Sequence, residues 1–411
     1  MHPGTIVIAL GGNAVAPPGE RATISTQFRH TRESLAPVVD LARGGWHIAL
    51  VHGNGPQVGD DLARNELAAD QVEPLPLGVL VAATAGWMGY MIQQSLQNAL
   101  TRAGVPRTVV TVITQTLCDA ADPDLRNATK PIGHALDPAR LAKLRALGVP
   151  VAEERPGLWR RLTPSPRPIA VVERDTIRHL VAAGHIVIAC GGGGPPVYDD
   201  PALHLEGIDA VVDKDRVAAI LGREIDADVL LILTNVDGVY HNYGTPRQKA
   251  IRRMDLREAD RLLASGELGT GNMRPKVEAA ADFVRAGGQR AVIAELAGGL
   301  AALQGETGTT LVAGAGVNLH EYQAREILDA LRHPVPARRR RYHAAGGEGD
   351  RRAVRRTRSM REGAGTHRRP GQGGGVKLAN NPAEAADTRR RIIGMTINGL
   401  PVQKVFVVPG R

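Results

Sequence analysis

The sequence is poor in cysteine and in long apolar runs, and each shortage excludes a class of protein. Its two cysteines, Cys118 and Cys190, form no CxxC pair and no Cys/His cluster at metal-ligand spacing. Neither a disulfide scaffold nor a zinc site is therefore indicated, and the low cysteine content favours a reducing compartment. No apolar stretch reaches the ~18 to 20 residues of a membrane span, and no basic segment with a cleavage site precedes Thr5. We therefore expect a cytoplasmic protein with no membrane contact.

Basic and acidic residues are unevenly distributed. The whole chain carries a formal charge of +9, but residues 316–411 hold 20 Lys and Arg against 8 Asp and Glu. Residues 1–315 hold 31 basic residues against 34 acidic ones and are slightly acidic. Because the basic surplus is confined to one end, the charge of the body does not favour nucleic-acid binding. We therefore expect no nucleic-acid partner.

Short runs rich in Val and Ile alternate with segments of helical period, the pattern of an α/β fold with a parallel sheet and crossover helices. The expected strands are residues 5–10, 47–52, 108–114, 186–190, 229–234 and 290–294, and the clearest helices are residues 86–103 and 175–183. Several prolines and a TKPIG segment break this rhythm between residues 119 and 168. We interpret this part, with a helix at 137–147 and a strand at 159–162, as a small subdomain inserted over the site.

The usual phosphate-binding motifs are missing, since the sequence has no GxxxxGK[ST] and its first glycine turn lacks the GxGxxG spacing. Instead, glycine-rich turns follow expected strands: GGNA at 11–14, HGNGPQVG at 52–59, GGGG at 191–194 and TNVDGVY at 234–240. Such turns present backbone N–H groups that bind phosphate or carboxylate oxygens. They would meet at the carboxyl edge of one sheet, where open α/β sheets bind ligands. The alternative is that they are only tight turns.

Three lysines stand in contexts that suit phosphoryl transfer: Lys130 in NATKPIG, Lys214 in VVDKD and Lys276 in GNMRPKVEAA. The last two are expected at helix N-termini, where a cation is unfavourable unless an anion is bound nearby. Phosphoryl transfer needs positive charge more than covalent chemistry. No histidine has the surroundings of a general base, which favours an acceptor that is already ionised, such as a carboxylate or carbamate. A solvated lysine is the alternative for each one alone.

Seven motifs together resemble the carbamate kinases of the amino-acid kinase superfamily over about residues 4–313. They are VIALGGNA, VHGNGPQVG, NATKPIG, VVDKD, ILTNVDGVY, GNMRPKVEAA and GETGTTL, in the family's order and at about its spacing. The resemblance implies a three-layer α/β/α sandwich with a mainly parallel central sheet and an inserted lid subdomain at about 119–168, in a domain spanning 1–315. It also implies a homodimer.

The reaction implied by the resemblance is the reversible conversion of ATP and carbamate to ADP and carbamoyl phosphate, mainly in the direction of ATP formation, as in arginine metabolism. Mg²⁺ is the implied cofactor. The resemblance implies that the nucleotide phosphates hold it, without a metal site of the protein's own.

The resemblance assigns a role to each matching residue. Catalytic roles fall to Lys130, Lys214, Asp215 and Lys276, with Asp215 organising the lysines. Substrate and phosphate binding fall to Gly11, Gly12, Asn13, Gly53, Asn54, Gly55, Gly191, Gly192 and Gly193. Nucleotide binding falls to Thr234, Val236, Asp237, Tyr240, Met273, Pro275 and Lys276. Arg274 and Asn235 depart from the family pattern, which usually has a small residue and often an aspartate there, and Arg274 makes the nucleotide affinity less predictable.

Residues 316–411 resemble a different class of protein. Residues 317–336 and 373–399 resemble pieces of the N-terminal domain of the succinyl-CoA synthetase β subunit, an ATP-grasp protein. The arginine-rich stretch between them resembles nothing. However, REGAGTH at 361–367 can be back-translated so that a shifted frame reads Val-Lys-Ala-Gln-Val-His, the segment an ATP-grasp domain carries there. We interpret 316–411 as an appended, frame-disturbed, ATP-grasp-like fragment, largely disordered and non-functional.

Three alternatives remain. A superfamily kinase for another acyl acceptor, such as acetylglutamate, would share the glycine turns, but the NATKPIG lysine and the inserted subdomain favour the carbamate branch. A nucleotide-binding regulator without turnover is disfavoured by the three lysines. An RNA-binding arm in the basic tail is disfavoured by the frame-shift argument.

Overall fold

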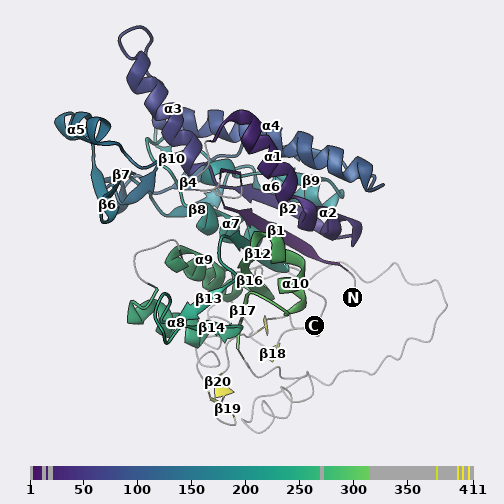
Figure 1. Cartoon of the computed structure of the whole chain (residues 1–411). Coiled ribbons are helices and arrows are strands. Elements are labelled where there is room, and N and C mark those ends of the chain that lie inside the picture. The colour runs from purple at the N-terminus through teal and green to yellow at the C-terminus, as the bar shows by residue number, and fades with distance from the viewer. Residues whose placement is uncertain are drawn as a thin grey trace, which may run out of the picture. The chain divides into compact units, whose positions relative to one another are not determined.

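The computed structural model describes residues 3–11, 15–16, 22–268 and 273–314, and four two-residue strands further along the chain (Figure 1). Two predicted substrate-binding residues, Gly12 and Asn13, lie outside the described residues. Most of the predicted ATP-grasp-like fragment at 316–411 does too. The chain divides into two compact units, Met1–Gly314 and Ala315–Arg411.

An eight-stranded sheet forms the centre of the first unit, in the order β15-β17-β16-β12-β1-β2-β9-β3. Neighbouring strands run parallel except for β16 and β17, which are antiparallel. The strands are β1 (Thr5–Leu10), β2 (His47–His52), β3 (Val109–Thr111), β9 (Ile186–Ile188), β12 (Val229–Thr234), β15 (Arg253–Asp255), β16 (Arg290–Glu295) and β17 (Thr309–Val312). The predicted mainly parallel α/β sheet is confirmed.

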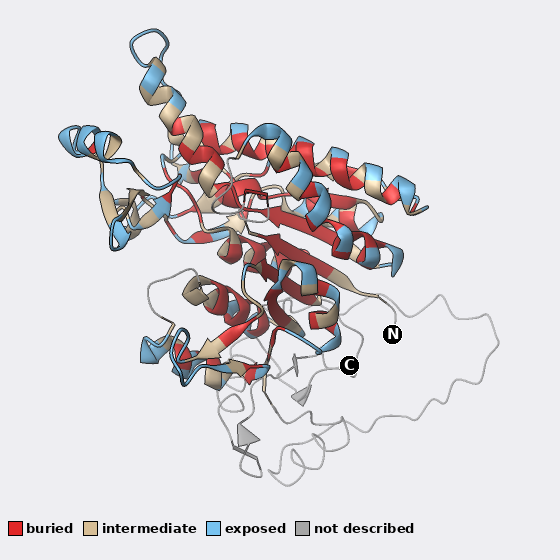
Figure 2. Cartoon of the chain, in the orientation of Figure 1, coloured by how far each residue is buried: buried red, intermediate tan, exposed pale blue. Residues whose placement is uncertain are grey.

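The sheet is apolar on both faces because its side chains alternate between two cores. Val7 and Ala9 of β1 enter one core, whereas Ile6 and Ile8 enter the other. One core is covered by α6 (Arg174–Ala182), α7 (Lys214–Glu224), α8 (Leu256–Ser265) and α9 (Met273–Arg285), the other by α2 (Ala36–Arg43), α4 (Leu77–Arg102) and α10 (Gly299–Gln304). Figure 2 shows these buried strands between the helices. This is the predicted three-layer sandwich.

Two further helices lie beside α4. They are α1 (Ile24–Ser34) and α3 (Gly55–Ala68), and both pack against it. The helix predicted at 86–103 begins earlier, at Leu77, because Leu80, Val81 and Ala85 are buried in its first turns. The helix predicted at 175–183 is α6.

The region predicted as an insertion contains a three-stranded antiparallel sheet in the order β5-β7-β6 and one helix. Its elements are β5 (Lys130–Ile132), α5 (Pro138–Ala146), β6 (Val151–Arg155) and β7 (Leu158–Thr163). Helix α5 is capped by Asp137, whose side chain accepts a hydrogen bond from the Arg140 amide at 2.8 Å. In Figure 1 this part projects from the rest of the first unit.

A four-stranded sheet in the order β11-β10-β4-β8 lies at the base of the inserted part. It comprises β4 (Thr116–Cys118), β8 (Pro168–Val171), β10 (Pro196–Asp200) and β11 (His204–Gly207). A separate hairpin pairs β13 (Val239–His241) with β14 (Lys249–Ile251).

In the second unit, β18 (Val376–Lys377) pairs in parallel with β21 (Phe406–Val407), and β19 (Thr396–Ile397) pairs antiparallel with β20 (Leu400–Pro401). Among the described residues, no helix has both the length and the apolar character needed to cross a membrane.

Candidate active site

The predicted glycine turns lie together at one edge of the central sheet. Gly11, Gly53 and Gly191 follow β1, β2 and the β9 segment, which are neighbours in the sheet. The Gly11 amide donates to the Leu233 carbonyl at 3.3 Å, and the Gly53 amide donates to the Leu10 carbonyl at 3.0 Å. These two N–H groups therefore join each turn to the neighbouring strand, so the Gly11 and Gly53 amides are not free to donate to an anion as expected. The binding of an anion by the other groups of the glycine turns stays a prediction.

The turn at 190–194 is interlocked with the turn after β2. Cys190 and Gly192 have left-handed backbones, with φ of 51° and 68°. A Cβ on Gly192 would overlap the Asn54 side chain, so glycine is needed for both conformation and space. Asn54 is buried, and its amide donates to the Thr84 hydroxyl at 2.8 Å. The left-handed Cys190 also explains why β9 ends at Ile188 rather than at the predicted residue 190.

His52 is buried behind these turns and is neutral. Burial lowers its pKa to about 4, although a hydrogen bond to the Gly53 carbonyl acts in the opposite direction. Its Nε2 has no hydrogen-bond partner among the described residues and lies against Gly191, where an added Cβ would come within 2.6 Å. The expectation that no histidine is poised as a general base is consistent with this placement.

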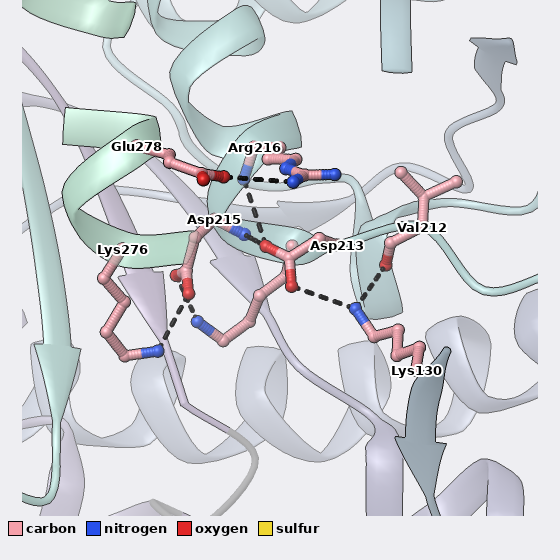
Figure 3. Close-up of polar contacts among 8 residues, drawn as sticks. Lys130, Val212, Asp213, Asp215, Arg216, Lys276 and Glu278 are labelled. Carbon is pink, nitrogen blue, oxygen red and sulfur yellow. Dashed lines mark hydrogen bonds and ion pairs between the residues drawn. The ribbon is translucent and has the colours of Figure 1, made fainter. Parts of the chain in front are cut away.

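Three lysines and two aspartates meet at the N-terminus of α7 (Figure 3). Asp215 is buried and pairs with two lysines at once: its Oδ2 lies 2.9 Å from the Lys276 Nζ, and its Oδ1 accepts a hydrogen bond from Lys214. Lys276 is in the first turn of α9 and is also buried. The two helices thus bring together residues that are 61 positions apart in the chain.

Lys130 reaches the same place from the inserted subdomain. Its Nζ lies 3.0 Å from the Asp213 Oδ2 and 3.3 Å from the Val212 carbonyl oxygen. Asp213 is the N-cap of α7, where its side chain accepts from the amides of Asp215 at 2.9 Å and Arg216 at 3.3 Å. The structure therefore brings the four predicted catalytic residues into one cluster. Asp213, which is not among the predicted catalytic residues, links Lys130 to this cluster.

Burial and opposite charge compete throughout this cluster. Burial alone would raise the pKa of Asp215 and of Asp213, but the neighbouring lysines outweigh it and hold both pKa values below the usual range. Burial lowers the pKa of Lys214, against the attraction of Asp215. For Lys276 the outcome is the opposite, because the attraction of Asp215 outweighs burial and raises the pKa of this lysine. With both aspartates ionised, three lysine cations face two carboxylates, which leaves a positive charge for an anionic ligand.

The predicted nucleotide-binding residues occupy two neighbouring segments. Thr234 ends β12, Val236 and Asp237 form the turn that follows, and Tyr240 lies in β13, where its hydroxyl donates to Asp237. Met273, Pro275 and Lys276 form the first turn of α9. Lys276 belongs to both this group and the lysine cluster. The assignment of these residues to a nucleotide stays a prediction.

Arg274, one of the two departures from the family pattern, makes polar contacts with two neighbouring residues. Its Nε lies 3.0 Å from a Glu278 carboxylate oxygen, and its Nη1 donates to the Leu263 carbonyl of α8 at 2.8 Å. Glu278 also pairs with Arg216 at 3.0 Å. Glu278 therefore compensates part of the charge that Arg274 adds. Asn235, the other departure, is exposed.

Among the described residues, no group of three or more His, Cys, Asp and Glu side chains is arranged to hold a metal ion. The two carboxylates nearest the lysines, Asp213 and Asp215, are both occupied by ion pairs.

Comparisons with known proteins agree on one family. A model described as the amino acid kinase family matches residues 4–295. The chain is 41% identical over 310 residues to the carbamate kinase of Pyrococcus horikoshii, covering 75% of this chain and 98% of the relative. It is 42% identical over 312 residues to the carbamate kinase of Clostridium perfringens, covering 75% and 99%.

Solved structures give the same result. The carbamate kinase from Giardia lamblia bound to AMP-PNP matches with a TM-score of 0.69 and 34% identity, over 75% of this chain and 98% of that chain. The same enzyme bound to citric acid matches with a TM-score of 0.71 and 34% identity, over 75% and 98%. The chain therefore belongs to the amino acid kinase family, and within it to the carbamate kinases.

Proposed function

We propose that the chain catalyses reversible phosphoryl transfer between ATP and carbamate, giving ADP and carbamoyl phosphate, and that it works mainly toward ATP. One observation supports this most strongly: Lys130, Lys214 and Lys276 converge on two carboxylates at the sheet edge where the glycine turns meet. Such a cluster neutralises the charge of a phosphoryl group in transit.

In the direction of ATP formation, the bond between phosphorus and the carbamoyl oxygen breaks, and a bond forms between phosphorus and a terminal oxygen of ADP. Carbamate leaves as an anion, and the attacking phosphate oxygen is already ionised, so neither end requires a proton transfer. This agrees with the burial of His52, which lowers its pKa to about 4 and makes it a weak base. Asp215 holds Lys214 and Lys276 in place, so their charges are positioned before the substrate arrives.

We propose that Mg²⁺ arrives with the nucleotide, because Mg²⁺ is commonly bound through substrate phosphates with few protein ligands. When bound, the ion would neutralise phosphate charge alongside the lysines.

We propose that the nucleotide lies over the turn after β12 and the first turn of α9, where Tyr240 and Met273 would frame it and Lys276 would contact its phosphates. The shared position of Lys276 supports this placement, because it links the nucleotide segment to the lysine cluster. We further propose a cytoplasmic homodimer that acts in arginine metabolism. An exposed edge supports the dimer: β3 ends the central sheet, and Tyr90 and Ile113 beside it are 57% and 47% exposed.

A coupled assay of ATP formation from ADP, Mg²⁺ and carbamoyl phosphate tests the reaction. We expect turnover by the full chain and a loss of about a hundredfold or more in Lys214→Ala. Lys143→Ala is the matched control, since Lys143 is exposed on α5 and should behave as the wild type. A chain that binds ADP but forms no ATP would be a nucleotide-binding regulator, and the proposal would be wrong.

A further inference from the structure

The inserted subdomain is joined to α3 by direct backbone contact. The Gly133 amide, just after β5, donates to the Gly55 carbonyl at 3.0 Å. One turn further along α3, a Cβ on Gly59 would overlap the Cα of Gly133. The end of β5 therefore packs backbone to backbone on the first turns of α3, with no room for a side chain between them.

A second contact lies farther along the same helix. The carboxylate of Glu66 receives two arginines from the subdomain: Arg140 of α5, at 3.3 Å, and Arg161 of β7. The three side chains are only 21%, 30% and 23% exposed. Partial burial reduces screening by water, so these pairs are stronger than ordinary surface ion pairs.

The subdomain that α3 holds in this way also carries Lys130. In the β5–β7 ladder, Arg161 lies opposite Ile132, and Lys130 lies opposite Thr163. Glu66 therefore holds the strand that is paired with the one that presents Lys130. Helix α3 begins at Gly55, the last residue of the substrate-binding turn predicted at 53–55. Helix α3 thus connects that turn to Glu66, which holds the strand paired with the one that carries Lys130.

We propose that Gly59 and Glu66 are positioning residues that dock the inserted subdomain on α3 and so set the place of Lys130 relative to the turn at 53–55. This proposal rests on the proposed function, because Lys130 acts there on the transferred phosphoryl group. Neither residue touches the reacting atoms. Their effect is on the geometry of the site, where small displacements of a charged group lower the rate strongly.

The test compares Glu66→Gln, Glu66→Asp and Gly59→Ala in the full chain. We expect Glu66→Gln to lower kcat for ATP formation about tenfold and Gly59→Ala to lower it more. The KM for ADP should change little, because the predicted nucleotide residues lie on β12, β13 and α9. Glu66→Asp, which keeps the charge, should recover part of the loss. Glu73→Gln is the matched control, since it removes the same charge from an exposed position.

Hydrogen exchange gives a readout that does not depend on turnover. Glu66→Gln should speed exchange in β5 and β7 but not in β1 or β2, whereas Glu73→Gln should change neither. Unchanged exchange in β5 and β7 of Glu66→Gln would overturn the proposal, and so would a kcat of Glu66→Gln equal to that of Glu73→Gln. Both outcomes can be read even if Gly59→Ala does not fold. If the wild type forms no ATP, the proposed function fails, and the exchange data still decide whether Glu66 docks the subdomain.

Discussion

The single carboxylate of Asp215 acts on the pKa of two lysines. The charge of Asp215 acts to raise the pKa of both lysines, although burial still outweighs it at Lys214. Its removal in Asp215→Asn should therefore lower the pKa of Lys214 further and lower that of Lys276. The lysines then lose their protons at a lower pH, so the alkaline limb of the pH profile of kcat/KM should move toward neutral pH. We also expect kcat at neutral pH to fall by about a hundredfold. Rate profiles of both proteins measure this.

An alkaline limb that stays in place while the rate falls would show that Asp215 acts only by holding the lysines, not on their charge. Glu73→Gln is again the control, because it removes a carboxylate away from the cluster and should leave the profile unchanged.

At the level of single residues, the sequence predicted the catalytic lysines better than the residues that hold them in place. The three lysines stand in recognisable motifs and were placed in one site. Glu66 was not predicted, because nothing in its local sequence indicates that two arginines 74 and 95 positions away would pair with it. Asp213 had a detectable signal as the N-cap of α7, but its contact with Lys130 arises only from the folding of the inserted subdomain.

At the scale of the element, the buried central strands were the most predictable. β1, β2 and β12 match their predicted bounds because each is a continuous apolar run covered on both faces. β3, predicted at 108–114, is only Val109–Thr111, since it lies at the edge and pairs on one side. The four-residue β17 was not predicted, and its antiparallel place beside β16 has no local sequence signal.

The glycine turn at 190–194 allows a test of why it needs glycine. Gly192→Ala combines a left-handed backbone with an overlap on Asn54, whereas Gly104→Ala meets nearly the same backbone, φ 67°, with no atom within 4 Å. In each variant, backbone strain alone should lower the free energy of unfolding by about 1–3 kcal/mol. We expect Gly192→Ala to lose more stability in urea unfolding than Gly104→Ala, and to lose activity as well. Equal losses would mean that the contact with Asn54 has no energetic role.

At the scale of the whole molecule, the first unit contains its own cores and every described residue of the site. We therefore predict that a chain ending at residue 315 keeps the kcat of the full chain. Sedimentation velocity should give the mass of a dimer for both. A shortened chain that loses activity or dimerisation would contradict the interpretation of residues 316–411 as a non-functional appendage.

Cys190 has a further consequence. Both thiols are buried, and burial raises the pKa of Cys118 to about 12 and the pKa of Cys190 well above its usual value. Since the thiolate is the reactive form, alkylating reagents should react with neither cysteine while the protein stays closed. Cys190 lies directly before the glycine turn, so its rate of alkylation would report how often this edge of the sheet opens. The chain thus carries a natural chemical reporter of motion beside its catalytic lysines.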